Sequence, residues 1–473
     1  MRLRTATVVA SLLTAGLTPL TLAAPASAAP AKYYDDFNGD GYRDLAVGSP
    51  FATVGSAQGA GAVVVFYGRS TGISTSGKRT VITQASANVA GTAEAFDFFG
   101  SSLTSADLDE DGYADLVVGA PREAMGTKEG AGQATVLWGG KSGLSGGSSL
   151  PQPSFDEWET YASGVAAADF DGDGHADLTL TGRTQSRLLR GPFKRSGTSV
   201  APLAASKLAF GSRVDVVAGD LSGDRAAERV YPYLVDDDPG GDISYHRWNG
   251  AKYLMTELTS ADGDVAAIGD IDHDGYGDLV VGNYEDPRSG APDGHKGGEI
   301  AVWYGSATGP DPAQTPTVIN QDTPGVPDTG ETEDHFGMSL SVGDVNGDGY
   351  ADVAVGAPDE KVGTKQYAGS VTVLFGSAAG LRASGAKTYT QDTAGVPDSA
   401  EKYDRFGSAV RVIDDNRNGR AELVIGAGDE NGYGSVTVLR GTDNGPTVTN
   451  AKVITARNVS LKGESAFGQV FSR

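Results

Sequence analysis

Cysteine is absent from the 473-residue sequence, which excludes disulfide bonds and thiolate metal sites as supports of the fold. Basic residues are also outnumbered, because 37 Lys and Arg stand against 61 Asp and Glu and give a formal net charge of −24. A chain of this charge is a poor partner for duplex DNA or an anionic membrane surface. We therefore expect no nucleic acid and no membrane surface among its partners.

Long apolar runs are missing from most of the chain, and the N-terminus is the exception. Arg2 and Arg4 precede an apolar run over Val8–Leu22, and the A-x-A site Ala26–Ala28 follows it. This order is typical of a secretory signal peptide, and no later run is long enough to span a membrane. We predict cleavage after Ala28, which makes residues 1–28 a signal peptide and the mature chain a secreted, extracellular protein without a membrane anchor.

Motifs of common catalytic and nucleotide-binding sites are missing as well, including HExxH, the P-loop and GxGxxG. A G-x-S-x-G motif occurs at Gly68–Gly72, but the nucleophile elbow of a hydrolase needs a strand-to-helix turn and no helix pattern follows. The equivalent segments Gly305–Gly309 and Gly376–Gly380 lack the serine, so we interpret all three as turns between strands. The sequence assigns no catalytic and no organic-cofactor residue, and it leaves enzyme activity open.

What the chain does contain is a recurring acidic loop. The segment Asp344–Asp352 reads Asp-Val-Asn-Gly-Asp-Gly-Tyr-Ala-Asp and has side-chain oxygens at positions one, three, five and nine. Alternating Asp and Asn place hard oxygen donors around one point, and Gly349 lets the backbone turn so that the carbonyl of Tyr350 joins them. This pattern predicts a Ca²⁺ loop.

The same frame occurs in five loops, which predicts about five Ca²⁺ sites. The expected ligands are the side chains at positions one, three, five and nine and the backbone carbonyl at position seven. They are Asp36, Asn38, Asp40, Tyr42 and Asp44; Asp107, Asp109, Asp111, Tyr113 and Asp115; Asp169, Asp171, Asp173, His175 and Asp177; Asp270, Asp272, Asp274, Tyr276 and Asp278; and Asp344, Asn346, Asp348, Tyr350 and Asp352.

These loops are not EF-hands. An EF-hand needs a bidentate Glu at position twelve and a flanking helix on each side. Position twelve is apolar in all five loops, and each loop leads into a short apolar strand such as residues 352–356. The acid at position nine must therefore supply the last ligand.

The loop marks an internal repeat. Two degenerate copies, at residues 220–228 and 414–422, fill the gaps in the series, and whether they bind metal stays open. The first acids then fall at 36, 107, 169, 220, 270, 344 and 414, which defines seven units of roughly 60 residues.

Short strands surround each loop. In the unit around residue 344, four β-branched or aromatic runs are separated by Gly and Pro, at residues 336–342, 353–358, 369–375 and 387–391. Seven such units predict an all-β fold, a seven-bladed β-propeller of four-stranded antiparallel blades, as a single domain over residues 29–473.

Two short motifs flank the loops. Phe-Gly precedes the loop at Phe99-Gly100, Phe210-Gly211, Phe336-Gly337 and Phe406-Gly407, and Gly-Ala-Pro follows it, as at Gly356–Pro358. With these motifs the chain resembles the FG-GAP repeat, the blade of the integrin α-subunit propeller, over nearly all of its mature length. Blades three and five depart from the pattern, with Tyr161-Ala162 and Asp262-Gly263 in place of Phe-Gly. The resemblance implies ligand recognition on the face opposite the calcium loops.

The two ends of the repeat are complementary. The first loop has no Phe-Gly before it, and a surplus Phe467–Phe471 at the end has no loop after it. We predict that the C-terminal strand pairs with the N-terminal segment and completes blade one. Closing the ring in this way removes two open sheet edges, which would otherwise invite aggregation.

Strand direction places the remaining segments. The first strand of a blade runs toward the calcium loop and the second runs back, so the Gly-Ala-Pro turns and the connections between blades lie on the opposite face, called the far face below. It carries Gln321–Asp328 and its repeat Gln391–Asp398. His335 stands there beside Glu331, Glu333 and Asp334, as a general base, a second metal site or part of a solvated acidic loop. These three readings stay open.

The main functional hypothesis is a monomeric, exported binding or cell-adhesion module with structural calcium and an unknown extracellular protein or glycan ligand. The alternatives are an extracellular hydrolase of the esterase or phospholipase type and a carbohydrate-binding lectin, both acting through the far face. The tyrosines at position seven of the loops could form a sugar platform, although packing over their own blade is the simpler expectation.

Overall fold

The computed structural model describes residues 31–151, 157–202, 206–207, 213–234, 242–258, 262–287 and 294–473. The predicted signal peptide over residues 1–28 and the pair Phe210-Gly211 lie outside these residues. Within them, helix is limited to two short 3-10 turns, η1 (Glu430–Gly432) and η2 (Ala456–Val459). No helix in this part of the chain is long and apolar enough to cross a membrane.

The described strands form seven antiparallel sheets, and two of these carry an additional short strand, β12 or β13. From the inner to the outer strand, the sheets contain β30 (Val470–Phe471), β1 (Leu45–Ser49), β2 (Ala62–Phe66) and β3 (Arg79–Ile82); β4 (Ser102–Ala106), β5 (Asp115–Ala120), β6 (Gln133–Leu137) and β7 (Gly147–Ser149); β8 (Gly164–Ala168), β9 (Asp177–Thr181), β10 (Gln185–Phe193), β11 (Ser199–Pro202) and β12 (Ser206–Lys207); β13 (Arg213–Val214) and β14 (Val217–Gly219), β15 (Glu228–Leu234), β16 (Asp242–Trp248) and β17 (Tyr253–Leu258); β18 (Val265–Gly269), β19 (Asp278–Asn283), β20 (Glu299–Trp303) and β21 (Thr317–Asn320); β22 (Ser339–Gly343), β23 (Asp352–Ala357), β24 (Ser370–Phe375) and β25 (Arg382–Tyr389); and β26 (Phe406–Ile413), β27 (Glu422–Ala427), β28 (Ser435–Arg440) and β29 (Thr447–Thr455).

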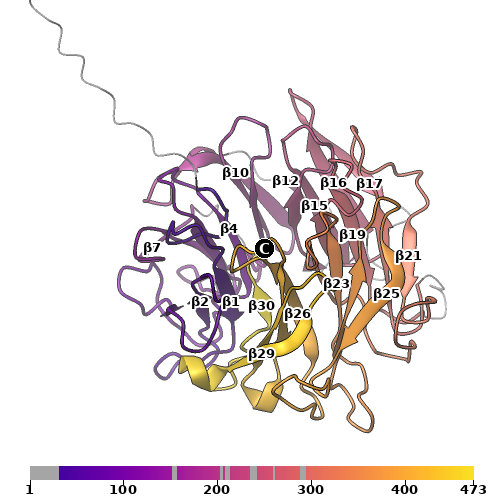
Figure 1. Cartoon of the computed structure of the whole chain (residues 1–473). Helices are drawn as coiled ribbons and strands as arrows, with labels where there is room; N and C mark the ends of the chain where they lie inside the picture. The colour runs from indigo at the N-terminus through magenta and orange to yellow at the C-terminus, as the bar shows by residue number, and fades with distance from the viewer. Residues whose placement is uncertain are drawn as a thin grey trace, which may run out of the picture.

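The sheets follow one another around a ring, with the C-terminus near its middle (Figure 1). The inner strands touch in the order β4, β8, β14, β18, β22 and β26, and β30 contacts both β26 and β4. This closed series confirms the prediction of a seven-bladed propeller. The strand pattern also explains the chain's alternation of short apolar runs with glycine turns, because each run crosses a blade once.

Ring closure uses both ends of the repeat, as predicted. β30 pairs with β1, with Val47 opposite Phe471 and Gly48 opposite Val470. Figure 1 shows the indigo strands of blade one beside the yellow strands of blade seven. The first blade therefore takes its inner strand from the last residues of the chain.

The apolar core lies between neighbouring blades, and the Phe-Gly motif supplies its largest side chains. Phe99, Phe336, Phe406 and Phe467 are fully buried, and Tyr161 fills the same place in blade three. The third-strand tryptophans, Trp138 and Trp303, are buried in blade junctions as well. Between blades three and four the described residues form two small clusters, centred on Tyr231 and Phe170. Among the described residues, these are the smallest apolar clusters between blades, and they lie beside blade four, whose loop is degenerate.

The glycine of Gly-Ala-Pro is required by the approach of the next blade. A Cβ on Gly356 would lie 2.1 Å from the carbonyl oxygen of Gly407, and on Gly282 it would lie 2.1 Å from that of Gly337. The neighbouring atom in each case is backbone, so it cannot move aside as a flexible side chain would. The two motifs therefore touch across the blade junction.

Replacing this glycine should separate two blades. We expect Gly356→Ala to cost about 1–3 kcal/mol of unfolding free energy, because the added methyl overpacks a backbone contact. Gly140→Ala is the matched control, since a Cβ there meets no atom within 4 Å. Urea unfolding monitored by tryptophan fluorescence measures both; equal midpoints for the two variants would contradict the packing role of Gly356.

Candidate metal sites

Each calcium-type loop leads into the second strand of its blade, and in blades two to seven it follows the first strand. The first acid of the loop shapes the turn. Asp36 accepts hydrogen bonds from the amides of Asp40 (3.1 Å) and Gly41 (2.8 Å) through its two oxygens. Asp107, Asp169, Asp270 and Asp414 make equivalent bonds, and Asp344 accepts from Gly347 and Gly349. A carboxylate oxygen has two lone pairs, so these bonds leave it able to bind a cation.

The ninth-position acid links the loop to the third strand. In blade six, Asp352 is fully buried and accepts from the Val345 amide and from the Gly376 amide, both at 3.0 Å. The equivalent acids are Asp44, Asp115, Asp177 and Asp278, each held in the same way. The degenerate loops keep only part of this arrangement, since Glu228 and Glu422 accept the amide of the loop's second residue.

Burial destabilises the ionised form of these carboxylates unless a positive charge lies beside them. Desolvation raises the pKa of Asp44 to about 9 and that of Asp115 to about 8. The same cause raises the pKa of Asp177, Asp278 and Asp352 to about 7. In each case a second acid of the same loop adds repulsion, so the metal-free loop favours a proton where a cation would otherwise sit.

The carboxylates converge in three of the loops. Three oxygens lie within 4.8 Å of one another in each of the sets Asp107, Asp109, Asp115; Asp169, Asp171, Asp177; and Asp270, Asp272, Asp278. Ca²⁺ binds oxygen at 2.3–2.6 Å, so two ligands across one ion are up to about 5 Å apart. The buried Oδ1 atoms of Asp109 and Asp171 have no hydrogen-bond partner. Orphaned oxygens in an all-oxygen donor set fit a hard divalent cation.

In the loops of blades one and six, an asparagine replaces the acid at position three. The oxygens of Asn38 and Asn346 each accept a backbone amide at 2.8 Å, from Asp40 and Asp348 respectively. These loops keep the same backbone turn as the others, with positive φ at Gly39 and Gly347. All twenty-five residues predicted as ligands thus lie on loops of one form, and three of the five loops bring three carboxylates together.

Two arginines reach the loops from blade three, and nothing in the sequence pattern indicates them. The Nε of Arg195 lies 2.6 Å from Asp109 Oδ2, and its guanidinium also pairs with Asp111. Arg190 lies 2.8 Å from Asp171. Both arginines contact Oδ2 of the third-position acid and leave its buried Oδ1 without a hydrogen-bond partner in the described part of the chain.

Position seven of each loop contacts position four of the preceding loop. Position four has positive φ in all seven loops, and it belongs to the neighbouring blade. The pairs are Tyr42 on Arg417, Tyr113 on Gly39, His175 on Glu110, Ala226 on Gly172, Tyr276 on Gly223, Tyr350 on His273 and Arg420 on Gly347. The tyrosines also pack on their own blade, as expected, since the Cβ atoms of Tyr42, Tyr113 and Tyr276 lie against Gly68, Gly139 and Gly305. Their rings in addition bridge to the preceding blade, so the seven loops form one continuous belt.

The raised pKa values predict opposite pH responses with and without calcium. A carboxyl whose pKa is raised from 3.8 to between about 7 and about 9 stabilises the metal-free fold fully below pH ~4, and this stability is lost as the pH rises through 7–9. Calcium needs the ionised form, so its stabilising effect grows over the same range. We expect the Tm of chelated protein to fall between pH 6 and 9 while that of calcium-loaded protein does not; parallel curves in differential scanning calorimetry would contradict this.

The far face has its own polar constellation. His335 Nδ1 lies 2.6 Å from Asp359 Oδ2, and Arg405 Nε lies 3.0 Å from the other oxygen of Asp359. These side chains and Tyr284 line a cavity of about 230 Å³ between blades. The hydrogen bond to Asp359 raises the pKa of His335. The partner of His335 is thus Asp359 from the next turn, whereas Asp334 accepts the amide of Glu331.

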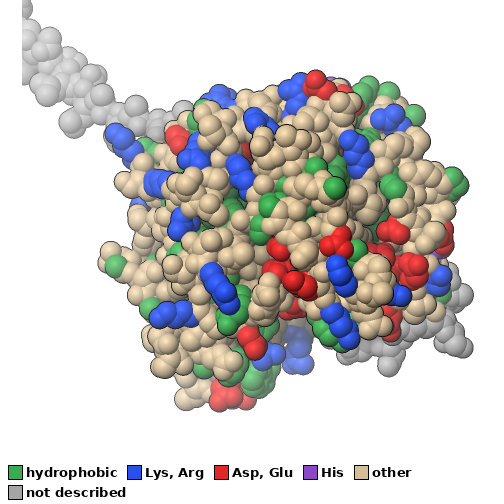
Figure 2. All heavy atoms as spheres, turned by 60° about the horizontal axis from the view of Figure 1, so that its bottom comes forward, with side chains coloured by type: hydrophobic (Ala, Val, Ile, Leu, Met, Phe, Trp, Pro, Cys, Tyr) green, Lys and Arg blue, Asp and Glu red, His purple; other side chains and the backbone are tan. Residues whose placement is uncertain are grey.

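A larger cavity of about 650 Å³ adjoins it between blades seven and one. Tyr403, which is 49% exposed, lines this cavity with Lys402, Arg405 and Asp429, and its ring stacks on Tyr367 at 5.3 Å. Figure 2 shows Asp and Glu side chains gathered in one region of the surface it displays, among scattered Lys and Arg. Aromatic and charged groups are therefore available together for a ligand on this face.

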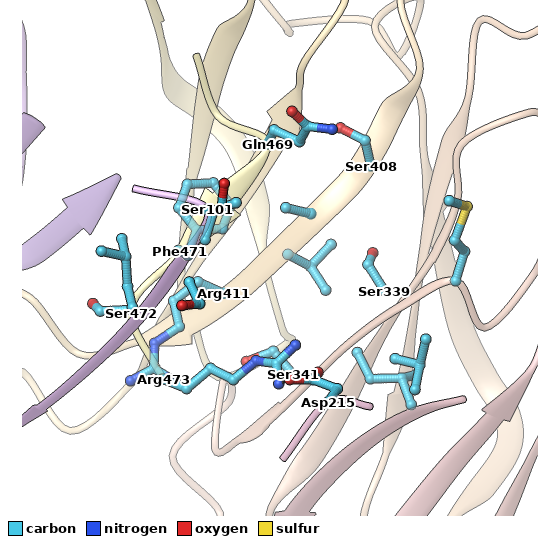
Figure 3. A pocket seen from close by; sticks show the side chains of 18 of the residues that line it. Ser101, Asp215, Ser339, Ser341, Ser408, Arg411, Gln469, Phe471, Ser472 and Arg473 are labelled. Carbon is cyan, nitrogen blue, oxygen red and sulfur yellow. Dashed lines mark hydrogen bonds and ion pairs between the residues drawn. The ribbon is translucent and has the colours of Figure 1, made fainter. Parts of the chain in front are cut away.

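The central channel is lined mainly by small and hydroxyl side chains. Figure 3 shows Arg473 extended toward Asp215 inside it, and Arg411 also lines this channel. Arg473 pairs with Asp215 at 2.5 Å, and Arg411 donates to the hydroxyl of Tyr34 at 3.1 Å. These charges bind the N-terminal segment and the last residue to the inner strands, so they help to hold the ring closed.

Comparison with known proteins agrees with this geometry. The FG-GAP repeat family matches residues 35–66, 99–137 and 336–374. Phosphatidylinositol-glycan-specific phospholipase D of Rattus norvegicus is 33% identical over 175 residues, 37% of this chain and 19% of that protein. Integrin alpha-3 of Cricetulus griseus is 27% identical over 199 residues, 41% of this chain and 16% of that protein. Integrin alpha-PS2 of Drosophila melanogaster is 29% identical over 253 residues, 52% of this chain and 17% of that protein.

The chain therefore matches only about a fifth of the length of these relatives. What it shares with them is the repeat and not the whole protein. Three matched repeats, the buried Phe-Gly side chains and seven blades in a closed ring agree with one another. The chain therefore contains FG-GAP repeats in three places, and its seven-bladed propeller is similar to the integrin α subunits in these repeats.

Proposed function

We propose that residues 29–473 form a single secreted propeller, freed by removal of the signal peptide at 1–28, that is held rigid by calcium and acts as an extracellular binding or adhesion module. The observation that carries the calcium part is the convergence of three carboxylates in each of three loops, with buried oxygens of Asp109 and Asp171 left unpartnered. Calcium, when bound, supplies the positive charge that these buried acids need. The twenty-five residues named above hold it, and it joins the first strand of a blade to the second and third.

The far face is the proposed recognition surface. Its cavity of about 650 Å³ offers an exposed aromatic ring at Tyr403 beside the cations Lys402 and Arg405. Ligand pockets commonly combine an apolar platform with a few placed polar groups. The integrin relatives carry an adhesion-protein name, and this supports an extracellular protein or a glycan as the ligand.

An array of extracellular proteins and glycans, probed with the labelled chain in calcium, tests this proposal. We expect binding that is lost in Tyr403→Ala and Arg405→Ala and retained in Thr308→Ala, an exposed residue in a turn on the calcium-loop face. Glycan spots alone would indicate the lectin form of the proposal. Binding that survives both far-face substitutions but not Thr308→Ala would overturn the assignment of the surface.

A second candidate, an extracellular hydrolase, is favoured by the pair His335–Asp359 in its cavity. A half-buried histidine held by a carboxylate can serve as a general base, and one relative is a phospholipase D. Esterase, phosphodiesterase and glycosidase substrates test it. Turnover that disappears in His335→Ala, with an unchanged Tm, would favour this candidate over the binding module.

A further inference from the structure

Three blade junctions on the far face share a buried glutamine–glutamate pair. The Nε2 atoms of Gln84, Gln321 and Gln391 donate to Glu123, Glu360 and Glu430 at 2.5, 2.7 and 2.6 Å. The glutamine follows the outer strand of one blade, β3, β21 or β25. The glutamate follows the second strand of the next, β5, β23 or β27. Each pair therefore spans a junction on the face away from the calcium-type loops.

At two of these junctions the carboxylates gather as they do in the loops. Oxygens of Asp328, Glu331 and Glu360 lie within 4.8 Å of one another, and those of Glu401, Asp404 and Glu430 do the same. Glu360 and Glu430 are only 4% and 3% exposed. Neighbouring acids repel each of them: Asp334, Asp328 and Glu331 face Glu360, and Asp404, Asp398 and Glu401 face Glu430.

The glutamines provide an independent sign of a missing partner. Gln321 and Gln391 are each 1% exposed, and their Oε1 atoms, like that of Gln84, have no hydrogen-bond donor among the described residues. The same amide group touches the acid cluster through Nε2, so this orphaned oxygen lies beside it. A buried amide oxygen without a donor costs free energy. A cation among these acids would satisfy it.

Basic side chains do not meet this need in the described residues. The strongest charge interactions of Glu360 and Glu430 are all with neighbouring acids. Lys365 acts on Asp404, but its Nζ pairs with Asp392 at 2.7 Å on the surface. His295 lies near the junction between blades five and six and pairs with Asp322 at 3.3 Å.

We propose that the junctions between blades five and six and between blades six and seven each bind one hard divalent cation of the calcium class. The ligands are Asp328, Glu331, Glu360 and Gln321 Oε1 at one junction, and Glu401, Asp404, Glu430 and Gln391 Oε1 at the other. All of the donors are oxygens, and they come from both blades. Each ion clamps two blades on the far face and does not depend on the loops of the opposite face.

The junction between blades one and two is a control built into the chain. It has the pair Gln84–Glu123. Gly91, however, occupies the position that Asp328 has at the junction between blades five and six. Its acids Glu94, Asp97 and Glu123 do not converge as the other two sets do. Its Gln84 Oε1 also lacks a donor in the described structure, but without three converging carboxylates this junction should keep its hydrogen bond and bind no ion.

The number of bound ions tests the proposal. The full secreted chain is dialysed to equilibrium against calcium, and the bound Ca²⁺ per chain is measured by mass spectrometry of the metal. We expect Glu360→Gln and Glu430→Gln each to lose one ion, the double variant two, and Glu123→Gln none. Asp328→Asn, at a half-buried position, should also lose one ion and covers the case in which Glu360→Gln does not fold.

Failure here and failure of the loop sites give different results. Asp348→Asn should lose an ion of the loop face and leave the far-face count intact. If Glu360→Gln, Glu430→Gln and Asp328→Asn all keep the ion count of the unsubstituted chain, the far-face sites do not exist. If they lose ions while Asp348→Asn does not, the far-face proposal holds and the loop proposal fails.

Discussion

Chelation with EGTA is expected to lower the Tm of this protein by at least several degrees. Each ion that binds only the folded chain stabilises it by about 2.7 kcal/mol when free calcium is 100 times its Kd. Five loop ions would then contribute on the order of 10 kcal/mol. There are no cysteines and hence no disulfides to replace this contribution. The apolar junctions and the contacts that close the ring must then hold the chelated protein.

Differential scanning calorimetry with calcium and with excess EGTA measures the effect. Chelated protein returned to calcium should regain its original midpoint, which separates ion loss from irreversible damage. Protein in magnesium at equal ionic strength controls for screening, since Mg²⁺ demands near-ideal octahedral geometry and keeps its water. A midpoint that does not change on chelation would contradict structural calcium.

Asp352→Ala is expected to destabilise the protein severely, by about 4 kcal/mol or more. The substitution removes a ligand and leaves the buried amides of Val345 and Gly376 without an acceptor, each costing about 1–3 kcal/mol. Asp348→Ala should have a smaller effect, because its oxygens serve the loop alone.

Asp224→Ala is the matched control for these substitutions. Asp224 occupies position five of the degenerate loop in blade four, is exposed and accepts only the Ala226 amide. We expect a change below about 1 kcal/mol there, as for an ordinary surface position. Urea unfolding in calcium ranks the three variants. Equal destabilisation by Asp352→Ala and Asp224→Ala would mean that the intact loops have no special role.

The blade count and the loop positions could be predicted because both depend on local chemistry. A calcium loop needs acids at fixed spacing and glycine where the backbone turns. A site such as Asp344–Asp352 can therefore be recognised from one segment of the sequence. Counting its copies gives seven blades without knowledge of tertiary structure. The surplus Phe467–Phe471 similarly indicated ring closure, because one motif lacked its loop.

Contacts between blades could not be predicted, since they depend on how neighbouring sheets are rotated. Arg195 pairs with Asp109 across a blade junction, although the two residues are 86 positions apart in the sequence. Tyr113 lies over Gly39 of the preceding blade in addition to packing on Gly139 of its own. Asp359 pairs with His335 only once the far-face turns are brought together. The ligands of one loop lie in a single segment of the sequence, whereas a contact at a blade junction joins two distant segments.

The proposed rigidity of the propeller depends most on divalent ions in the five intact loops. A crystal grown in calcium, with data collected at a wavelength where calcium scatters anomalously, shows each ion directly. We expect an anomalous peak enclosed by the side chains of each loop, as at Asp107, Asp109, Asp111 and Asp115, with the carbonyl of Tyr113 beside it. Loops that hold water and give no peak in millimolar calcium would contradict the central claim.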